Sequence, residues 1–599
     1  MCGPAKKRAF MPGAFDRADA LRRLGDTHFD VLVIGGGVTG AGTALDAASR
    51  GLRTALVERF DFASGTSSKS SKMVHGGLRY LQQGDVRLVY EALAERQRLR
   101  KNAPHLVKVL PFLLPVFGKG GVIPRKLSRA LGSAMWMYDL TGGARIGKLH
   151  KRISADEALA HMPTLPRERL AASYLYYDAR ADDARLTLTL ARTAAIDFGA
   201  AAVNRAKVVA IRKDTAGRAI GATIEADDDQ GGTTTLDVTA DAVVNAGGVW
   251  SDDLRSLDEG THPASIRPAK GVHITVPWSK IRNDIAVVVP VPEDRRSVFV
   301  VPWGDFTYIG TTDTDYDGPL DDPQCTAEDI DYLLGAINHA IVGELTTDDV
   351  LGTWAGLRPL VRDAGSERTA DLSRRHRVTP SASGMVTVTG GKLTTYREMA
   401  ADTVDLVLEH VLGVKVLERV TKHSRTRHLS LRGAEGYEEL VTSASTAGRI
   451  GAETLDHLAN RYGGEARTLI AMLERDRSLA EPLVPGLPYL RAEAVYAARY
   501  EMARTVDDIL SRRTRARLLA RDASAAAAAD VAALVAPDLG WDADEQRAQV
   551  EAYRAAVTAE RAAAHLPETA LDASTLLASG AGTRVRADET EPAAGTGRR

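Results

Sequence analysis

The stretch VLVIGGGVTGAGTALDAASRGLRTALVERF, residues 31–60, decides the fold because its hydrophobic pattern changes twice along its length. An apolar run at 31–34 is typical of a buried strand, and an alanine-rich segment at 40–50 predicts a helix. A second short apolar run at 54–58 predicts another strand. The pattern therefore predicts one strand, helix, strand unit with parallel strands.

The turn between the first strand and the helix carries the chemistry of this unit. Three glycines in the spacing of a dinucleotide fingerprint lie here: Gly35, Gly37 and Gly40. Glycines permit a tight turn and the close approach of a pyrophosphate, and a helix N-terminus favours an anion. Glu58 ends the second strand, where its carboxylate can accept hydrogen bonds from ribose hydroxyls. We therefore predict a dinucleotide site, which NAD and FAD would both satisfy.

Two later glycine turns favour the longer cofactor, FAD. The segment AVVNAGGVW, 242–250, is a predicted buried strand that ends in Gly247 and Gly248. The segment MVTVTGGKLTTYREMA, 385–400, is another, with Gly390 and Gly391 before a helix. A long cofactor needs a second helix N-terminus near its flavin end, whereas a simple NAD domain would not require the chain to come back to the ligand at residue 390. Ordinary strand-to-helix turns remain the alternative interpretation.

Length and composition limit the other functions that this chain could have. The 599 residues suggest about four folding units. A formal net charge of -1 gives no general attraction to nucleic acid. The two cysteines, Cys2 and Cys325, cannot form a disulfide framework, so we expect a reducing, intracellular setting. No run of 18 apolar residues occurs, so membrane contact would be peripheral.

Hydrophobic patterning beyond the fingerprint predicts two further layers. Short β-rich runs over about 267–317 suggest an antiparallel sheet, and a helix is predicted over 86–101. From about Leu429 the chain is expected to be helical. The apolar residues of this part with the spacing of one helix face are Val495, Ala498, Met502, Val506 and Ile509.

Four segments together resemble FAD-dependent glycerol-3-phosphate dehydrogenase of the respiratory type. They are FASGTSSKSSKMVHGGLRYL (62–81), KGVHITVP (270–277), AGLRPL (355–360) and GGKLTTYR (390–397). The resemblance covers about 25–560 and is far more specific than the glycine fingerprint. It also places the chain in the wider superfamily that includes D-amino-acid oxidase.

The resemblance implies an α/β fold, with a Rossmann-like FAD-binding domain, an antiparallel β substrate layer and a C-terminal helical domain. We expect an N-terminal extension over 1–24, the oxidoreductase domain over 25–415, the helical domain over 425–565 and a disordered tail over 566–599. Within the oxidoreductase domain, the FAD-binding segments are expected at about 25–105, 172–266 and 380–415. The substrate layer is expected at about 106–171 and 267–379.

The resemblance also implies the residues of a phosphate-dianion site. Oxidation of sn-glycerol 3-phosphate requires cations for the phosphate and a base for the C2 hydroxyl proton. The implied catalytic residues are His273, Arg358 and Lys392, and these three also contact substrate together with Arg79, Tyr80 and Arg374. A neutral imidazole at His273 could accept the proton as hydride leaves for the flavin.

The implied cofactor site includes the serine-rich loop, residues 63–72, which follows the fingerprint unit. Its hydroxyls and backbone N–H groups could bind the pyrophosphate and ribityl chain. The expected FAD-binding residues are Gly35, Gly37, Gly40, Glu58, Ser64, Thr66, Ser67, Ser70, Ser71, Lys72, Gly247, Gly391 and Thr394. His75 is expected near the flavin, which we assume to be bound non-covalently, and no metal site is expected.

The electron acceptor implied by the resemblance is a membrane quinone, which would place the protein on the cytoplasmic face of the inner membrane. The segment 111–140 could meet anionic lipid through Lys119, Arg125, Lys126 and Arg129 among apolar residues. A helical subdomain with a solvated basic face explains this pattern equally well. A homodimer is a further expected assembly.

Three other activities remain open. An oxidase that uses oxygen would share the substrate motifs, and an amine or amino-acid oxidase would bind a carboxylate instead. A flavin-binding sensor would use its helical domain for interactions. That domain carries no recognisable chemistry, so we expect it to dock on the FAD domain, with Tyr500, Arg512 and Arg513 on exposed faces.

Overall fold

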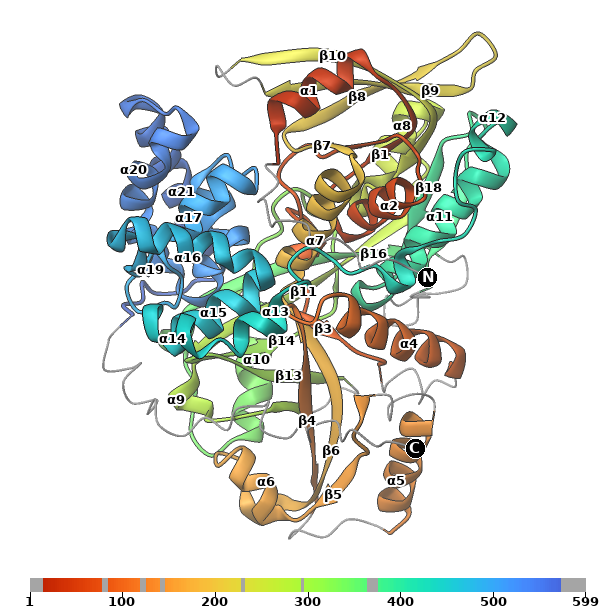
Figure 1. Ribbon diagram of the computed structural model, residues 1–599. Coiled ribbons are helices and arrows are strands. Elements are labelled where there is room, and N and C mark those ends of the chain that lie inside the picture. The colour runs from red at the N-terminus through yellow and green to blue at the C-terminus, as the bar shows by residue number, and fades with distance from the viewer. Residues whose placement is uncertain are drawn as a thin grey trace, which may run out of the picture.

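The computed structural model describes residues 15–77, 85–118, 125–140, 146–227, 232–291, 296–362 and 375–571. Two sheets and a group of C-terminal helices make up the molecule (Figure 1). The predicted Arg79, Tyr80, Arg374 and Lys119, and the end of the expected tail from residue 572, lie outside the described residues.

The first sheet contains the predicted fingerprint unit at its centre. Its strand order is β17-β18-β10-β1-β2-β7, and all neighbours from β18 to β7 are parallel. The strands are β1 (His28–Ile34), β2 (Thr54–Val57), β7 (Ala201–Val203), β10 (Thr233–Asn245), β17 (Arg377–Pro380) and β18 (Val386–Thr389). The antiparallel strands β8 (Ala206–Lys213) and β9 (Ala219–Asp227) extend the sheet from β10.

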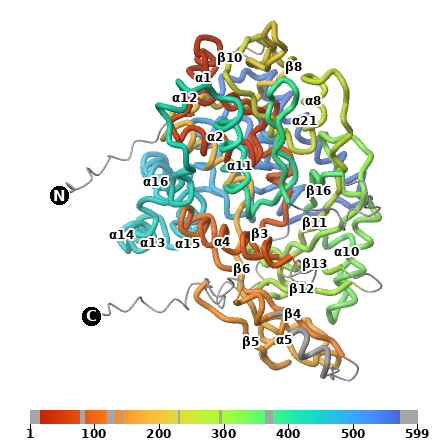
Figure 2. Tube along the Cα trace, turned by 90° about the vertical axis from the view of Figure 1, so that its right-hand side faces the viewer, coloured from red at the N-terminus to blue at the C-terminus, as the bar shows by residue number. Residues whose placement is uncertain are grey.

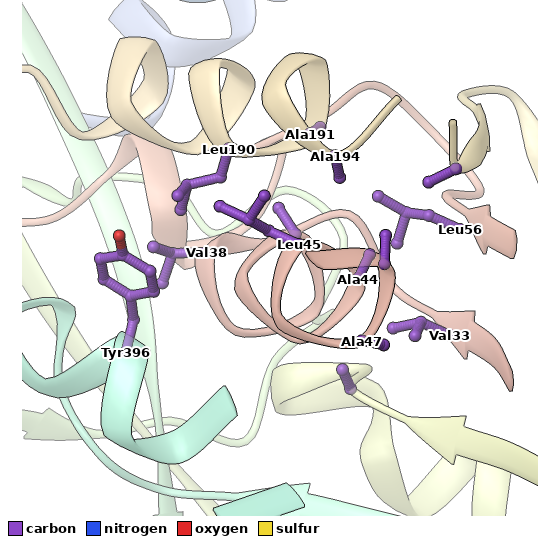
Figure 3. Packing of buried hydrophobic residues seen from close by; sticks show 14 of the residues in the cluster. Val33, Val38, Ala44, Leu45, Ala47, Leu56, Leu190, Ala191, Ala194 and Tyr396 are labelled. Carbon is purple, nitrogen blue, oxygen red and sulfur yellow. The ribbon is translucent and has the colours of Figure 1, made fainter. Parts of the chain in front are cut away.

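Helix α2 (Val38–Ser49) covers one face of this sheet because small residues allow close packing. A Cβ atom at Gly42 would lie 2.7 Å from Tyr396, the first residue of α11 (Tyr396–His410). Figure 3 shows Leu45 of α2 facing Leu190 of helix α7 (Asp183–Arg192), and Ala44 beside the strand residue Leu56. On the opposite face, Leu32 and Ile34 pack with helix α1 (Arg17–Asp26).

The second sheet confirms the predicted antiparallel layer. Its order is β15-β11-β14-β13-β12-β4-β6-β3, with β16 added to β11 and β5 to β6. Among the described strands of this sheet, only β4 and β12 pair in parallel, and the other pairs are antiparallel. The strands are β3 (Met73–Val74), β4 (Val107–Phe117), β5 (Lys151–Ile153), β6 (Leu170–Ala181), β11 (Ile266–Pro277), β12 (Ala286–Pro290), β13 (Ser297–Trp303), β14 (Phe306–Gly310), β15 (Thr314–Asp315) and β16 (Gly352–Val361).

Further helices lie around the two sheets. Helix α4 (Val86–Asn102) confirms the predicted helix over 86–101. Both views place α5 (Arg125–Leu140) at the end of the molecule that is remote from the first sheet (Figures 1 and 2). The others in this part are α6 (Ala155–His161), α8 (Ser251–Glu259), α9 (Trp278–Ile281), α10 (Ala327–Ala340) and α12 (Val414–Leu417).

The C-terminal part is helical, as predicted, but one expected helix is interrupted. Helix α17 (Arg491–Tyr500) ends before Met502, whose φ of 57° is incompatible with a continuing right-handed helix. The predicted helix face from Val495 to Ile509 is therefore wrong. The other helices are α13 (Tyr437–Val441), α14 (Ala444–Ile450), α15 (Ala452–Tyr462), α16 (Ala466–Arg475), α18 (Ala516–Leu519), α19 (Arg521–Ala526), α20 (Ala528–Leu539) and α21 (Ala543–Ala563).

Buried ion pairs hold this helical part on the first sheet's loops. Asp61 accepts hydrogen bonds from Arg513 Nη1 at 2.7 Å and Nη2 at 2.8 Å, and from Arg512 Nε at 2.7 Å. Arg513 is only 1% exposed and the side chain of Arg512 only 12%, so the expectation that Arg512 and Arg513 lie on exposed faces is wrong. Tyr500 is half-buried beside Tyr496. The helical part is thus docked on the first sheet's loops, in agreement with the expected docking.

Candidate active site

The fingerprint glycines form a turn that has room only for hydrogen in place of a side chain. Gly35 has a φ of 112°, and a Cβ atom there would lie 2.5 Å from the carbonyl oxygen of Ala246. A Cβ atom at Gly40 would lie 1.8 Å from the carbonyl oxygen of Gly35. Gly37 is the N-cap of α2, so the backbone N–H groups that begin this helix follow the turn directly. This cradle fits the pyrophosphate of a dinucleotide.

Glu58 lies beside the same turn at the end of β2. Its two carboxylate oxygens accept hydrogen bonds from the backbone N–H of Gly36 at 2.6 Å and of Phe60 at 2.9 Å. Burial raises the pKa of Glu58, and these two hydrogen bonds oppose that shift. The carboxylate is thus held in place at the position where the fingerprint expects a ribose partner.

The two later glycine turns lie at the carboxyl ends of neighbouring strands. Gly247 follows β10, and its backbone N would lie 3.3 Å from a Cβ atom at Gly35. Gly391 follows β18 and precedes Thr394. Thr394 Oγ1 accepts a hydrogen bond from the backbone N–H of His75 at 3.1 Å and donates to its carbonyl at 3.3 Å. The turn at Gly247 therefore lies against the fingerprint turn, and the turn at Gly391 leads to a residue that is bonded to His75, as expected.

The serine-rich loop lies between the two sheets. Ser67 Oγ accepts a hydrogen bond from the backbone N–H of Val38, at the start of α2, at 2.9 Å. Thr66 Oγ1 donates to the carbonyl of Leu357 in β16 at 2.5 Å. Ser64 donates its backbone N–H to the carbonyl of Asp61 at 3.0 Å. The loop is therefore held by hydrogen bonds to helix α2 and to strand β16.

The end of this loop meets strands of the second sheet. Ser71 Oγ is 2.8 Å from His273 Nε2, and the Ser71 carbonyl accepts a hydrogen bond from Tyr308 Oη at 2.9 Å. Lys72 Nζ lies 4.5 Å from the centroid of the Trp354 ring. Burial lowers the pKa of Lys72 to about 8, although the nearby Asp183 carboxylate favours its charged form.

His273 is the buried centre of this group. The side chain of His273, in β11, stacks on Trp354 with 4.7 Å between ring centroids and 7° between planes, and the residue is 2% exposed. Its Nδ1 is buried and has no hydrogen-bond partner among the described residues. Burial lowers the pKa of His273 well below 6.5, and the charges of Lys72 and Arg358 lower it further. The imidazole is therefore neutral near pH 7.

Arg358 lies on β16, the neighbour of β11, near His273. A Cβ atom at Gly271, two residues before His273 on the same face, would lie 2.5 Å from Arg358 Nη2, so only glycine leaves room for the guanidinium. Arg358 Nη1 donates to Asp313 Oδ1 at 3.0 Å, and Nη2 donates to Thr311 Oγ1 at 3.2 Å. The structure thus brings a cation and a neutral imidazole to one face of the second sheet.

Lys392 lies in the turn that follows strand β18 of the first sheet. It is half-buried at the N-cap of the short 3-10 turn Leu393–Thr395, directly after Gly391. Its charge contributes to the lowered pKa of Asp85, after the larger contribution from Arg375. His75 also lies near this turn and contacts the ring of Phe299 edge-on.

Sequence reasoning missed several residues that shape the site. Trp354 and Tyr308 flank His273, and Asp183 binds the serine-rich loop. Asp183 follows Asp182, the N-cap of α7. An aspartate at an N-cap predicts where a helix starts, but it does not predict a contact with a distant loop. Among the residues that the structure describes, no group of three or more His, Cys, Asp or Glu side chains could hold a metal ion.

Comparisons with known proteins agree with this architecture. Residues 30–397 match the family model described as FAD dependent oxidoreductase. Residues 424–546 match the C-terminal domain of alpha-glycerophosphate oxidase. The fold and the site therefore define an FAD-dependent oxidoreductase, and FAD is its cofactor.

Named relatives show to which family of FAD-dependent oxidoreductases this chain belongs. Glycerol-3-phosphate dehydrogenase 2 of Mycobacterium tuberculosis is 41% identical over 584 residues, which cover 97% of this chain and 96% of that protein. The mitochondrial glycerol-3-phosphate dehydrogenase of Homo sapiens is 37% identical, over 90% of this chain and 74% of that protein. The FAD complex of the Bacillus halodurans glycerol-3-phosphate dehydrogenase is 32% identical with a TM-score of 0.72, covering 92% of this chain and 98% of that one. The chain belongs to the FAD-dependent glycerol-3-phosphate dehydrogenase family.

Proposed function

We propose that this protein oxidises sn-glycerol 3-phosphate to dihydroxyacetone phosphate and passes the electrons to a membrane quinone. The observation that carries the substrate assignment is the pair formed by neutral His273 and Arg358 on one face of the second sheet. A guanidinium can bind two phosphate oxygens at once, and a neutral imidazole can accept a proton. The dehydrogenase names of the relatives support the same substrate.

The residues of the substrate site have separate roles in this proposal. Arg358 binds the phosphate, together with Arg79, Arg374 and Lys392, and Tyr80 contacts the substrate. Bound FAD supplies the acceptor for the hydride that leaves C2. His273 accepts the C2 hydroxyl proton at Nδ1, while its Nε2–H donates to Ser71 Oγ and fixes the ring.

The proposed FAD site uses three groups of residues. The backbone at Gly35, Gly37 and Gly40 receives the pyrophosphate, and Glu58 receives the ribose. The serine-rich loop and the two later turns complete the site through Ser64, Thr66, Ser67, Ser70, Ser71, Lys72, Gly247, Gly391 and Thr394. The observed turn without room for a Cβ atom at Gly35 or Gly40 supports this assignment.

Quinone as acceptor is tested by turnover with sn-glycerol 3-phosphate. We expect a water-soluble quinone analogue to reoxidise the substrate-reduced flavin at least about tenfold faster than air-saturated buffer does. Peroxide released in stoichiometric amount with dihydroxyacetone phosphate would instead identify an oxidase. The flavin of an amine or amino-acid oxidase would be reduced by an amine or an amino acid and not by sn-glycerol 3-phosphate.

Helix α5 is our proposed contact with anionic lipid, which would bring the protein to the cytoplasmic face of the inner membrane. Among the described helices, none is long and apolar enough to cross a membrane. Leu140 at its end is 81% exposed and Trp136 is 55% exposed. Arg125, Lys126 and Arg129 belong to the same helix. Apolar and basic residues on one helix suit an interfacial position. The homodimer stays a prediction.

Replacing Leu140 by serine should weaken sedimentation with anionic vesicles at low salt by about tenfold, because a buried leucine contributes about 1.5–3 kcal/mol. Leu257→Ser is the matched control, since Leu257 is also exposed but lies on α8, beside the first sheet. Equal binding of both variants and the unchanged protein, or failure of the unchanged protein to sediment, would rule out α5 as the contact.

A further inference from the structure

The carboxylate of Asp183 holds the end of the serine-rich loop. Its Oδ2 accepts hydrogen bonds from Ser70 N at 2.9 Å and from Ser70 Oγ at 2.7 Å. Its Oδ1 lies 3.3 Å from Lys72 Nζ. Asp183 is 0% exposed, so these contacts are made away from water, where charge-assisted hydrogen bonds are strong. One side chain of the first sheet's helix α7 thus fixes both ends of the segment Ser70–Lys72.

Arg515 connects this carboxylate to the C-terminal helical part. Its Nη2 pairs with Asp183 Oδ1 and also donates to the carbonyl of Ser68 at 3.0 Å. Its Nε lies 3.2 Å from Asp182 Oδ1. Arg515 is fully buried. The guanidinium therefore binds both the serine-rich loop and the residue that positions that loop.

The segment from Ser70 to Lys72 is in contact with His273. Ser71, between Ser70 and Lys72, has its hydroxyl 2.8 Å from His273 Nε2. The carbonyl of Ser70 accepts a hydrogen bond from Trp354 Nε1 at 3.2 Å, and Trp354 stacks on His273. A displacement of this segment would therefore change the orientation of the imidazole through two independent contacts.

We propose that Asp183 and Arg515 are positioning residues for His273, so that the C-terminal helical part orients the site without contributing an atom to it. This inference rests on the proposed function, because it concerns the rate of the proposed proton and hydride transfer. A misplacement of about 1 Å at a reacting group can cost about 100-fold in rate. Substrate affinity, which depends on the phosphate cations, should change little.

The test compares Asp183→Asn with Glu465→Gln in the purified FAD-loaded protein. Glu465 is also buried and also joins the C-terminal part to α7, through a hydrogen bond from Arg192 at 2.5 Å. It accepts another from Arg432, within the C-terminal part, at 3.0 Å, and neither arginine lies in the serine-rich loop. We expect Asp183→Asn to lower the limiting rate of anaerobic flavin reduction by about 10- to 100-fold. The apparent Kd for sn-glycerol 3-phosphate should stay within about threefold, and Glu465→Gln should stay within about threefold of the unchanged protein in both quantities.

Arg515 supplies a second, independent arm. Arg515→Met should lower the same limiting rate, and Arg515→Lys, which keeps the charge, should recover part of it. The double variant Asp183→Asn/Arg515→Met should be no slower than the slower single variant, because both changes break one connection. If Asp183→Asn does not fold, Ser70→Ala removes one donor to the same carboxylate and should slow reduction by severalfold.

Three results would overturn this inference. Equal rate losses in Asp183→Asn and Glu465→Gln would show a role in stability alone. Recovery of the full rate at saturating FAD would show a role in cofactor binding alone. Equal rates for Arg515→Met, Arg515→Lys and the unchanged protein would remove the C-terminal part from the mechanism. If the unchanged protein is not reduced by sn-glycerol 3-phosphate, the proposed function itself fails, which is a separate outcome.

Discussion

Replacement of His273 by asparagine is expected to slow reduction of the flavin by sn-glycerol 3-phosphate by about 10²- to 10⁴-fold. A positioned general base contributes a factor of this size, and the asparagine side chain cannot accept a proton near neutral pH. The change should be seen in the limiting rate of anaerobic stopped-flow reduction, with FAD still bound.

The control for this prediction is His161→Asn. His161 Nδ1 lies 3.0 Å from Asp284 Oδ1, and the residue is at the end of α6, away from the serine-rich loop. Its variant should reduce flavin at the unchanged rate. A His273 variant with a nearly normal limiting rate would exclude the imidazole as proton acceptor.

The pH dependence gives an independent check on the same residue. Because the pKa of His273 lies well below 6.5 in the folded protein, the imidazole is already neutral at pH 6.5 and above. Proton uptake by His273 therefore begins only as the pH falls well below 6.5. We expect no loss of the limiting rate from His273 protonation between about pH 6.5 and 9. A loss near pH 6.5 that disappears in His273→Asn would contradict the burial-based assignment.

Replacement of Arg358 by methionine is expected to lower kcat/KM for sn-glycerol 3-phosphate by about 10- to 100-fold. A hydrogen bond to a charged group contributes about 1.5–3 kcal/mol, and each 1.4 kcal/mol is about tenfold. Most of the loss should appear in KM, because the phosphate is bound equally before and during the reaction. Steady-state kinetics with inorganic phosphate as a competitor measures it, since phosphate should inhibit the variant more weakly.

Arg267→Met is the matched control for this charge. Arg267 lies on the neighbouring strand β11 and pairs with Asp315 at 2.6 Å, just as Arg358 pairs with Asp313. Each substitution leaves one aspartate without its guanidinium, so the comparison corrects for the loss of that ion pair. Equal kinetics for the two variants would remove Arg358 from the substrate site.

Local sequence patterns predicted those parts of the fold that depend on neighbouring residues. The fingerprint unit, the antiparallel layer and α4 were found because hydrophobic period and glycine spacing are local properties. The interrupted helix after Tyr500 was missed because Met502 carries no sequence sign of its left-handed backbone. Helical spacing alone therefore overstated the length of that element.

The site was predictable only where motifs carry its chemistry. His273 and Arg358 were found through the resemblance, and the structure places them on adjacent strands. The contact between Asp183 and Arg515 joins residues 332 positions apart, and neither lies in a recognised motif. Buried charge pairs of this kind depend on tertiary packing, so they become visible only when the C-terminal helices are seen on the first sheet.

The central claim is tested most directly by anaerobic titration of the FAD-loaded protein with sn-glycerol 3-phosphate, followed at the flavin absorbance band at about 450 nm. We expect full bleaching by about one equivalent of substrate at a concentration well above its Kd, with one dihydroxyacetone phosphate formed per flavin. Glycerol and D-alanine serve as controls that lack the phosphate. An oxidised spectrum that persists with sn-glycerol 3-phosphate, or bleaching by D-alanine instead, would contradict the proposed substrate.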